Sequence, residues 1–187
     1  MAILEIKKYP DEILKKKSSP VDNINGDLER LIDDMVETMH AVSGIGLAAP
    51  QIGVSKRLIV VDVSTKDEKY PPVPPPVVPP QKISDFLGTP VVIINPEIIE
   101  TDGFVDSEEG CLSIPGYIST IKRVEKIVVR GLDRDGKPLQ FEANGLFARA
   151  IQHEIDHLNG ILFVDRMSYI KREFFKKRYL KKSTVSS

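Results

Sequence analysis

Two histidines four residues apart place the strongest constraint on how this chain of 187 residues can fold. They belong to the run His153-Glu154-Ile155-Asp156-His157, and positions four apart share one face of an α-helix. In a helix both imidazoles could bind one metal ion, and Glu154 borders the same face, close enough to reach a water on that ion. The alternative is a helix whose histidines are satisfied by solvent or by polar groups of the core. Only three histidines occur in the chain and two form this pair, which favours the metal site.

A third metal ligand is needed, because two nitrogens and a water leave tetrahedral coordination one protein ligand short. Cys111 is the only cysteine, and a thiolate is a strong ligand for Zn²⁺ or Fe²⁺. A single cysteine also excludes an intramolecular disulfide and fits a reducing compartment. We therefore predict a catalytic site with Cys111, His153 and His157 as metal ligands and one open position.

The composition is that of a globular protein, with 41% apolar and 28% charged residues. The formal net charge of −1 gives no overall field that would favour binding to DNA or to a membrane. The first residues lack the apolar core and cleavage site of a signal peptide, and no run of about 18 apolar residues predicts a membrane span. We expect a cytoplasmic protein.

Hydrophobic periodicity and turn residues predict four helices and mainly antiparallel strands. The helices are expected at residues 10–17, 27–42, 144–159 and 168–182. Strands are expected at 57–63, at 91–100 with a break at Asn95-Pro96, and at 124–132 and 138–143, where the last two form a hairpin. Asn144 is expected to cap its helix and Gly160 to end it. This order predicts an α+β fold in a single domain over residues 1–187.

A proline-rich insert at about 66–90 interrupts this pattern. Residues 70–80 carry seven of the chain's 14 prolines, which favours polyproline II and excludes a sheet strand. We expect an extended segment over the surface. Docking to an aromatic groove of a partner is an alternative with less support.

Three segments, in the same order as in the family, resemble the signature motifs of peptide deformylases. They are Gly44-Ile45-Gly46-Leu47-Ala48-Ala49-Pro50-Gln51, Glu109-Gly110-Cys111-Leu112-Ser113 and Gln152-His153-Glu154-Ile155-Asp156-His157. The resemblance covers most of the chain outside the insert. It implies an α+β fold in which antiparallel sheets pack around a central metal-binding helix, followed by a C-terminal helix.

The resemblance also implies an activity, the removal of the formyl group from N-formylmethionine of new polypeptides. The usual metal of the family is Fe²⁺, often replaced in preparations by Zn²⁺, Ni²⁺ or Co²⁺. Glu154 would take a proton from the attacking water and later deliver it to the leaving amine. By resemblance, the Gln51 side-chain amide and the Leu112 backbone N–H surround the oxyanion.

By resemblance, the substrate peptide adds as a strand beside Gly44-Ile45-Gly46, so Gly46 is a substrate-binding residue. By resemblance, the pocket for the methionine side chain is formed by Ile45, Leu146, Arg149 and Ala150. Arg149 is unexpected in such a wall, although its aliphatic stem could line the pocket while the guanidinium reaches water. For Leu146, plain core packing is an equal alternative.

Glu109 is expected to support the site by pairing with Arg123, as similar enzymes do. The alternative for Glu109 is a surface carboxylate. Asp156 could orient a neighbouring group or could be a solvated helix residue. His40, on the helix at 27–42, is expected on the surface without a partner.

The segment 171–182 carries seven cations against one acid, a local charge of +6. A solvated helix face is the simpler interpretation. Some family members dock a C-terminal helix on the ribosome, so the resemblance makes the ribosome a possible partner through phosphate contacts.

Two other protein classes remain open from the residues alone. A zincin-type peptidase uses the same histidine pattern, but it takes a third ligand from downstream, where only Glu173 is available. A non-catalytic protein with a closed metal site needs a fourth protein ligand, and the chain has no second cysteine to supply one. The native metal and the oligomeric state stay open.

Overall fold

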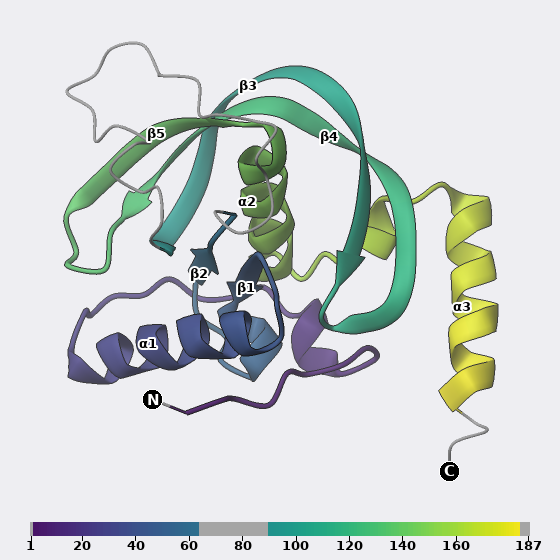
Figure 1. Cartoon of the computed structure of the whole chain (residues 1–187), viewed down its shortest axis with the longest axis horizontal. Helices are drawn as coiled ribbons and strands as arrows, with labels where there is room; N and C mark the ends of the chain where they lie inside the picture. Colours follow the sequence, from purple (N-terminus) through teal and green to yellow (C-terminus); the bar gives the residue numbers. More distant parts are fainter. Residues whose placement is uncertain (1, 64–89, 184–187) are drawn as a thin grey trace.

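The computed structural model describes residues 2–63 and 90–183. Within these residues a five-stranded antiparallel sheet with the order β1-β2-β3-β4-β5 is combined with three α-helices (Figure 1). The strands are β1 Gly46–Ala48, β2 Leu58–Val61, β3 Val91–Cys111, β4 Ile114–Leu132 and β5 Pro138–Asn144. The helices are α1 Gly26–Ala41, α2 Gly145–Leu158 and α3 Tyr169–Ser183, and the 3₁₀ turns are η1 Glu12–Lys15, η2 Ala49–Ile52 and η4 Phe163–Arg166. The predicted α+β class and the C-terminal helix are confirmed.

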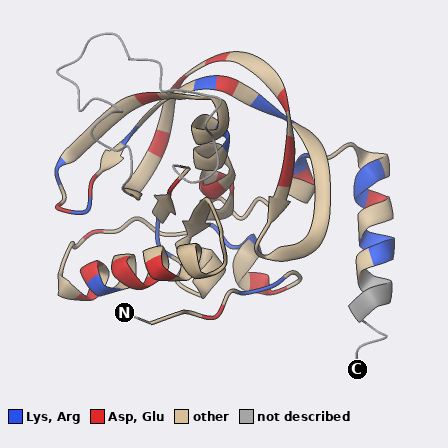
Figure 2. Ribbon diagram, viewed as in Figure 1, with Lys and Arg blue, Asp and Glu red and all other residues tan. Residues whose placement is uncertain are grey.

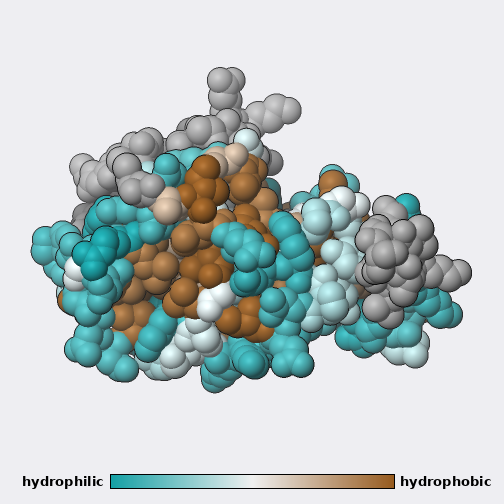
Figure 3. Space-filling model, turned by 90° about the horizontal axis from the view of Figure 1, so that it is seen from below, coloured by the Kyte–Doolittle hydropathy of each residue, from teal (hydrophilic) through white to brown (hydrophobic). Residues whose placement is uncertain are grey.

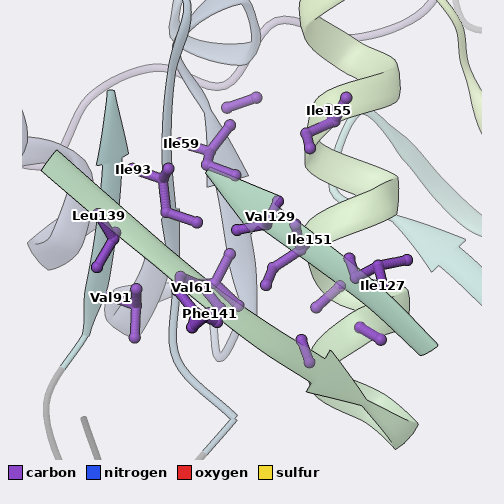
Figure 4. Packing of buried hydrophobic residues seen from close by; sticks show 14 of the residues in the cluster. Ile59, Val61, Val91, Ile93, Ile127, Val129, Leu139, Phe141, Ile151 and Ile155 are labelled. Carbon is purple, nitrogen blue, oxygen red and sulfur yellow. The ribbon is translucent and has the colours of Figure 1, made fainter. Parts of the chain in front are cut away.

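The interior strand β2 is buried on both faces because all four of its residues are apolar. Leu58 and Val60 lie in one core cluster with Met35 and Met39 of α1. Their neighbours Ile59 and Val61 point to the other face and join the cluster of α2 (Figure 4). Successive side chains of a strand alternate between faces, so the continuous apolar run holds α1 and α2 on opposite sides of the sheet.

The face of α2 that packs on the sheet carries Ile151 and Ile155, which lie against Ile127 and Val129 of β4 (Figure 4). This core fixes the rotation of α2 about its axis. The histidines of the motif consequently face away from the apolar cluster.

β3 and β4 form one long hairpin that arches over α2 (Figure 1). The two strands pair from Ile94 opposite Leu132 as far as Cys111 opposite Ile114. Ile114 is buried in a third cluster with Leu14 of η1 and Phe163 of η4. The turn of the hairpin is thereby anchored beside α2, and Cys111 stands at its tip.

The expected helices are largely confirmed. Those at 27–42, 144–159 and 168–182 correspond to α1, α2 and α3. The short helix at 10–17 is present only as the 3₁₀ turn η1. Asn144 stands at the N-cap of α2, but its side chain accepts no capping hydrogen bond. Gly160 follows the end of α2 with φ of +70°, where a Cβ would lie 2.4 Å from the carbonyl oxygen of Lys15.

The hairpin predicted at 124–132 and 138–143 is confirmed by the pairing of β4 with β5. The break predicted at Asn95-Pro96 is wrong, because β3 continues through it with a shift of register between Ile94 and Glu97. Asn95 absorbs the irregularity with φ of 53°. Its side-chain amide exchanges two hydrogen bonds of 2.9 Å with the backbone of Val21. The insert at 66–90 and its prolines lie almost entirely outside the described residues.

In the part of the chain that the structure describes, no helix is long and apolar enough to cross a membrane. One face nevertheless shows hydrophobic residues in its centre with hydrophilic residues around them (Figure 3). Apolar surface framed by polar residues is typical of a face that binds a ligand or a partner.

Two adjacent phenylalanines of α3 offer a test of how this helix is anchored. Phe175 is 2% exposed, and its ring centroid lies 4.8 Å from that of Tyr117 and 5.5 Å from that of Tyr9. Phe174 is 68% exposed. We predict that Phe175→Ala lowers the free energy of unfolding in urea by about 3 kcal/mol, whereas Phe174→Ala changes it by less than about 0.5 kcal/mol. Equal effects of the two substitutions would contradict this anchoring.

Candidate active site

The structure brings the three predicted metal ligands together from two elements. Cys111 comes from the hairpin tip and the two histidines from successive turns of α2. One ligand atom of each residue lies within 4.8 Å of the others, and Cys111 Sγ is 3.2 Å from His157 Nε2. A thiolate and two imidazoles at this spacing could hold one ion such as Zn²⁺ or Fe²⁺. Glu173, the downstream ligand that a zincin-type peptidase would require, lies on α3 and pairs with Lys176 instead.

The hydrogen bonds of the cluster suit metal binding. His153 Nδ1 lies 2.9 Å from Glu109 Oε2, so Nδ1–H donates to the carboxylate and Nε2 is the ring atom left to face an ion. Burial raises the pKa of the Cys111 thiol, but the charges and hydrogen bonds of His157 and His153 outweigh it and hold that pKa well below 9.0. The Ser113 backbone N–H, 3.4 Å from Sγ, also favours the thiolate.

The two histidines differ in how they are held. The His153 ring is oriented by a direct hydrogen bond to the charged carboxylate of Glu109. The Nδ1 atom of His157 is buried and has no hydrogen-bond partner among the described residues. The position of the His153 ring therefore depends on the groups that fix Glu109.

Glu109 is fixed by a buried ion network. Arg123 Nε and Nη2 donate to its two oxygens at 2.7 and 2.9 Å, which is the predicted pair and excludes the surface alternative. Burial raises the pKa of Glu109, but the bonds from Arg123 and His153 prevail and bring it to about 2. Arg123 also donates to Asp156 at 2.6 Å. Asp156 is 4% exposed, so it is not the solvated helix residue that the sequence left open.

Gln51 is oriented as a hydrogen-bond donor toward the cluster. Its Oε1 accepts the Ala48 backbone N–H at 2.8 Å. Its Nε2 therefore points to Ser113 Oγ at 3.3 Å and Cys111 Sγ at 3.6 Å. The side chain is 1% exposed, so the amide is a preorganised donor next to the metal ligands.

Glu154 is buried beside the same cluster. Burial raises its pKa to about 7, with the charges of the two histidines acting in the opposite direction. Its Oε2 has no hydrogen-bond partner among the described residues. The carboxyl group packs against Gly46, where a Cβ would lie only 2.4 Å from Oε1. A carboxyl group with a pKa near neutrality is suited to accept and return a proton.

A cavity of about 590 Å³ opens onto this cluster, a size typical of small-molecule sites. Its wall contains Gln51, Leu112 and Glu154, and it also contains the five predicted substrate residues Ile45, Gly46, Leu146, Arg149 and Ala150. Arg149 is half-buried and has no ion-pair partner in the described ranges. Every residue predicted to touch the substrate therefore borders one space, and Leu146 is a wall residue rather than only a core residue.

Several residues of the site were missed by the sequence reasoning. The Ala48 N–H that orients Gln51 and the Ser113 hydroxyl carry no sequence signal beyond their place in the motifs. Arg166 forms two hydrogen bonds with Asp156, and no signal in the sequence indicates this pair. His40 is exposed as expected, but it does have a partner, since its Nε2 lies 2.9 Å from Asp62 Oδ2.

The chemistry available at this site is that of a metal-dependent hydrolase, because a proton acceptor and a fixed amide donor flank the side of the cluster that faces the cavity. Comparisons with known proteins narrow this class. A family model described as "Polypeptide deformylase" matches residues 3–173. A peptide deformylase of Thermodesulfovibrio yellowstonii is 54% identical over 179 residues, which is 96% of this chain and 98% of the relative.

Solved structures agree with the family match. A peptide deformylase from Legionella pneumophila is 43% identical with a TM-score of 0.81 and covers 99% of this chain and 98% of its own. One from Ehrlichia chaffeensis is 39% identical with a TM-score of 0.85, covering 99% of both chains. The chain belongs to the polypeptide deformylase family, whose members hydrolyse the formyl group at the N-terminus of nascent polypeptides.

The contact between Gly46 and Glu154 generates a prediction. Gly46→Ala forces the Glu154 carboxyl group away from its place, so we expect kcat to fall by roughly 10²-fold or more while bound metal stays near one ion per chain. Gly26→Ala is the matched control, because a Cβ there meets no atom closer than 3.9 Å. Unchanged turnover in Gly46→Ala would show that the position of Glu154 is unimportant.

Proposed function

We propose that this chain removes the formyl group from N-formylmethionyl nascent peptides, with Cys111, His153 and His157 holding one divalent ion. The observation that carries the proposal is the buried Glu154 carboxyl group, with a pKa of about 7, beside the cluster and open to the cavity. A bound metal would supply Lewis acidity that activates a water and polarises the formyl carbonyl. We propose Fe²⁺ as the ion in the cell, with Zn²⁺, Ni²⁺ or Co²⁺ able to replace it.

Glu154 acts as general base and then as general acid. Its carboxylate takes the proton of the attacking water as the new C–O bond forms. The same carboxyl group later gives this proton to the methionine nitrogen as the C–N bond breaks, so formate and a free amine leave. A pKa close to working pH suits both directions of transfer.

Gln51 and Leu112 stabilise the oxygen that becomes negative when water attacks the formyl carbon. The Gln51 amide is already aimed at the cluster and needs no reorientation during the reaction. The Leu112 backbone N–H lies next to Cys111 at the hairpin tip and supplies the second donor. Both donors lie beside the metal ligands, so they can stabilise the oxyanion only when the formyl carbonyl is bound close to those ligands.

The substrate peptide lies along β1. This strand pairs with β2 on one side only, so within the described residues its other edge is free to accept an added strand. Ile45, Leu146, Ala150 and the aliphatic stem of Arg149 line the pocket for the methionine side chain. Gln51 and Glu154 border the cavity beside the metal ligands, so we expect an acyl group larger than formyl to be disfavoured there.

We also propose that residues 1–187 form one catalytic domain that works in the cytoplasm. The parts of the site lie on one continuous sheet, on the helix α2 that packs against it and on the short turn η2. A cysteine ligand requires a reducing compartment to stay available for a metal.

Substitution of Glu154 separates this function from a structural metal site. We predict that Glu154→Gln keeps the metal, measured by elemental analysis of purified protein, and lowers kcat for a formyl-methionyl peptide by roughly 10²- to 10⁴-fold. Glu125→Gln is a matched control, because Glu125 is exposed on β4 and does not line the cavity. If Glu154→Gln retained full turnover, Glu154 would not be the proton carrier.

The basic helix α3 is proposed to contact ribosomal RNA. Lys and Arg residues recur along the part of α3 that is coloured by charge in Figure 2, and Ile170 and Phe174 on the same helix are 67% and 68% exposed. Clustered cations bind phosphates without sequence specificity, and the bound counterions that they release make such binding sensitive to salt.

A triple substitution tests this contact without disturbing the buried Phe175. We predict that replacing Lys171, Lys177 and Arg178 by Gln lowers co-sedimentation with ribosomes at low salt by roughly tenfold or more. The control removes three exposed cations from β4, namely Lys122, Lys126 and Arg130. Equal binding by both variants would assign the contact to overall charge and not to α3.

A further inference from the structure

An alternating chain of charges runs from the metal cluster to the surface behind α2. It begins at His153, which donates to Glu109, and continues through Arg123 to Asp156. It ends at Arg166 of η4, whose guanidinium forms two hydrogen bonds with the two oxygens of Asp156. Each carboxylate of the chain is thus held between two donors.

Solvent reaches this series of charged side chains at its outer end, which is Arg166. The side chains of Arg123, Asp156 and Glu109 are 1%, 6% and 9% exposed, whereas that of Arg166 is 41% exposed. Arg166 and Asp156 also line a second cavity of about 650 Å³ on this side of the molecule. The outer guanidinium can therefore be removed or replaced without opening the apolar core.

Removal of Arg166 changes the balance of charge among the buried side chains of Arg123, Glu109 and Asp156. Arg123 carries one positive charge and contacts two carboxylates. With Arg166 in place Asp156 has a cation of its own, and Arg123 can keep two of its donors on Glu109. Without Arg166 the buried Asp156 has Arg123 as its only cationic partner, because Arg123 and Arg166 are the two cations within 4.0 Å of it in the described ranges. A buried carboxylate without a compensating charge is costly, so a carboxylate that loses one cationic partner attracts the remaining partner more strongly.

We propose that Arg166, acting through Asp156, is a positioning residue that sets how tightly the metal is bound. The inference rests on the metal site proposed above. A guanidinium drawn toward Asp156 loosens its hold on Glu109 Oε2, the atom that orients the His153 ring. Among the described residues the Nδ1 atom of His157 has no hydrogen-bond partner, so none of them gives this second histidine a comparable anchor. Arg166 thus affects the metal without touching it.

The test uses the full-length protein loaded with Zn²⁺, and the free ion is measured against a competing chelator. Partners that contact a metal-bound histidine directly change affinity by roughly 10- to 100-fold. We expect roughly three- to tenfold weaker Zn²⁺ binding for Arg166→Ala, since it acts through three intervening groups, and a partial loss for Arg166→Lys. Arg130→Ala is the control, because Arg130 also pairs with a carboxylate, Glu97, which borders the same second cavity but forms no ion pair with Asp156 or Arg166 among the described residues.

A second measurement separates positioning from a merely structural role. Guanidinium ion at non-denaturing millimolar concentration can enter the second cavity and sit beside Asp156 in Arg166→Ala. We expect it to restore Zn²⁺ affinity in this variant and not in wild type, whereas sodium chloride of equal ionic strength does not. A structural defect of η4 would not respond to a free cation of the right shape.

The outcomes distinguish the inference from the function on which it rests. If wild-type protein binds no metal, the proposed function fails. If wild type binds Zn²⁺ and Arg166→Ala binds it as tightly as Arg130→Ala, the inference is overturned. Weaker binding without rescue by guanidinium also overturns it. If Arg166→Ala does not fold, Arg166→Lys decides, and unchanged affinity in that variant overturns the inference.

Discussion

The buried pairing of Arg123 with Glu109 and Asp156 is the interaction on which the site depends most. Arg123 and Glu109 belong to the hairpin, and Asp156 belongs to α2. The metal cluster is divided in the same way, with Cys111 on the hairpin and both histidines on the helix. The ion network therefore holds the two halves of the cluster in register. Breaking a buried pair of this kind costs about 3–5 kcal/mol, far more than a surface ion pair contributes.

The rest of the fold serves to place α2. Its apolar face is fixed against the sheet, and this leaves the opposite face for the metal ligands and for Glu154. Gly46 on β1 allows the Glu154 carboxyl group to lie against the backbone, where burial raises its pKa to about 7. The burial of α2 therefore also raises the pKa of Glu154 to a value that suits proton transfer.

Much of this could be predicted from the sequence because it is local. The spacing of His153 and His157 predicts a helix, and the family resemblance indicated the pocket residues and the support of Glu109 by Arg123. The partner of Asp156 could not be predicted, because Arg166 meets it through tertiary packing. The break expected at Asn95-Pro96 failed for a similar reason. An asparagine at positive φ, held by Val21 from a distant segment, keeps β3 continuous.

The most direct test of the central claim is the release of formate by anaerobically prepared, Fe²⁺-loaded protein. A formyl-methionyl peptide and the matching acetyl-methionyl peptide differ by one methyl group at the acyl carbon. The structure predicts rapid formate release from the first and hydrolysis of the second that is slower by roughly 10- to 200-fold or more. Absence of formate release, or equal hydrolysis of the two peptides, would contradict the account.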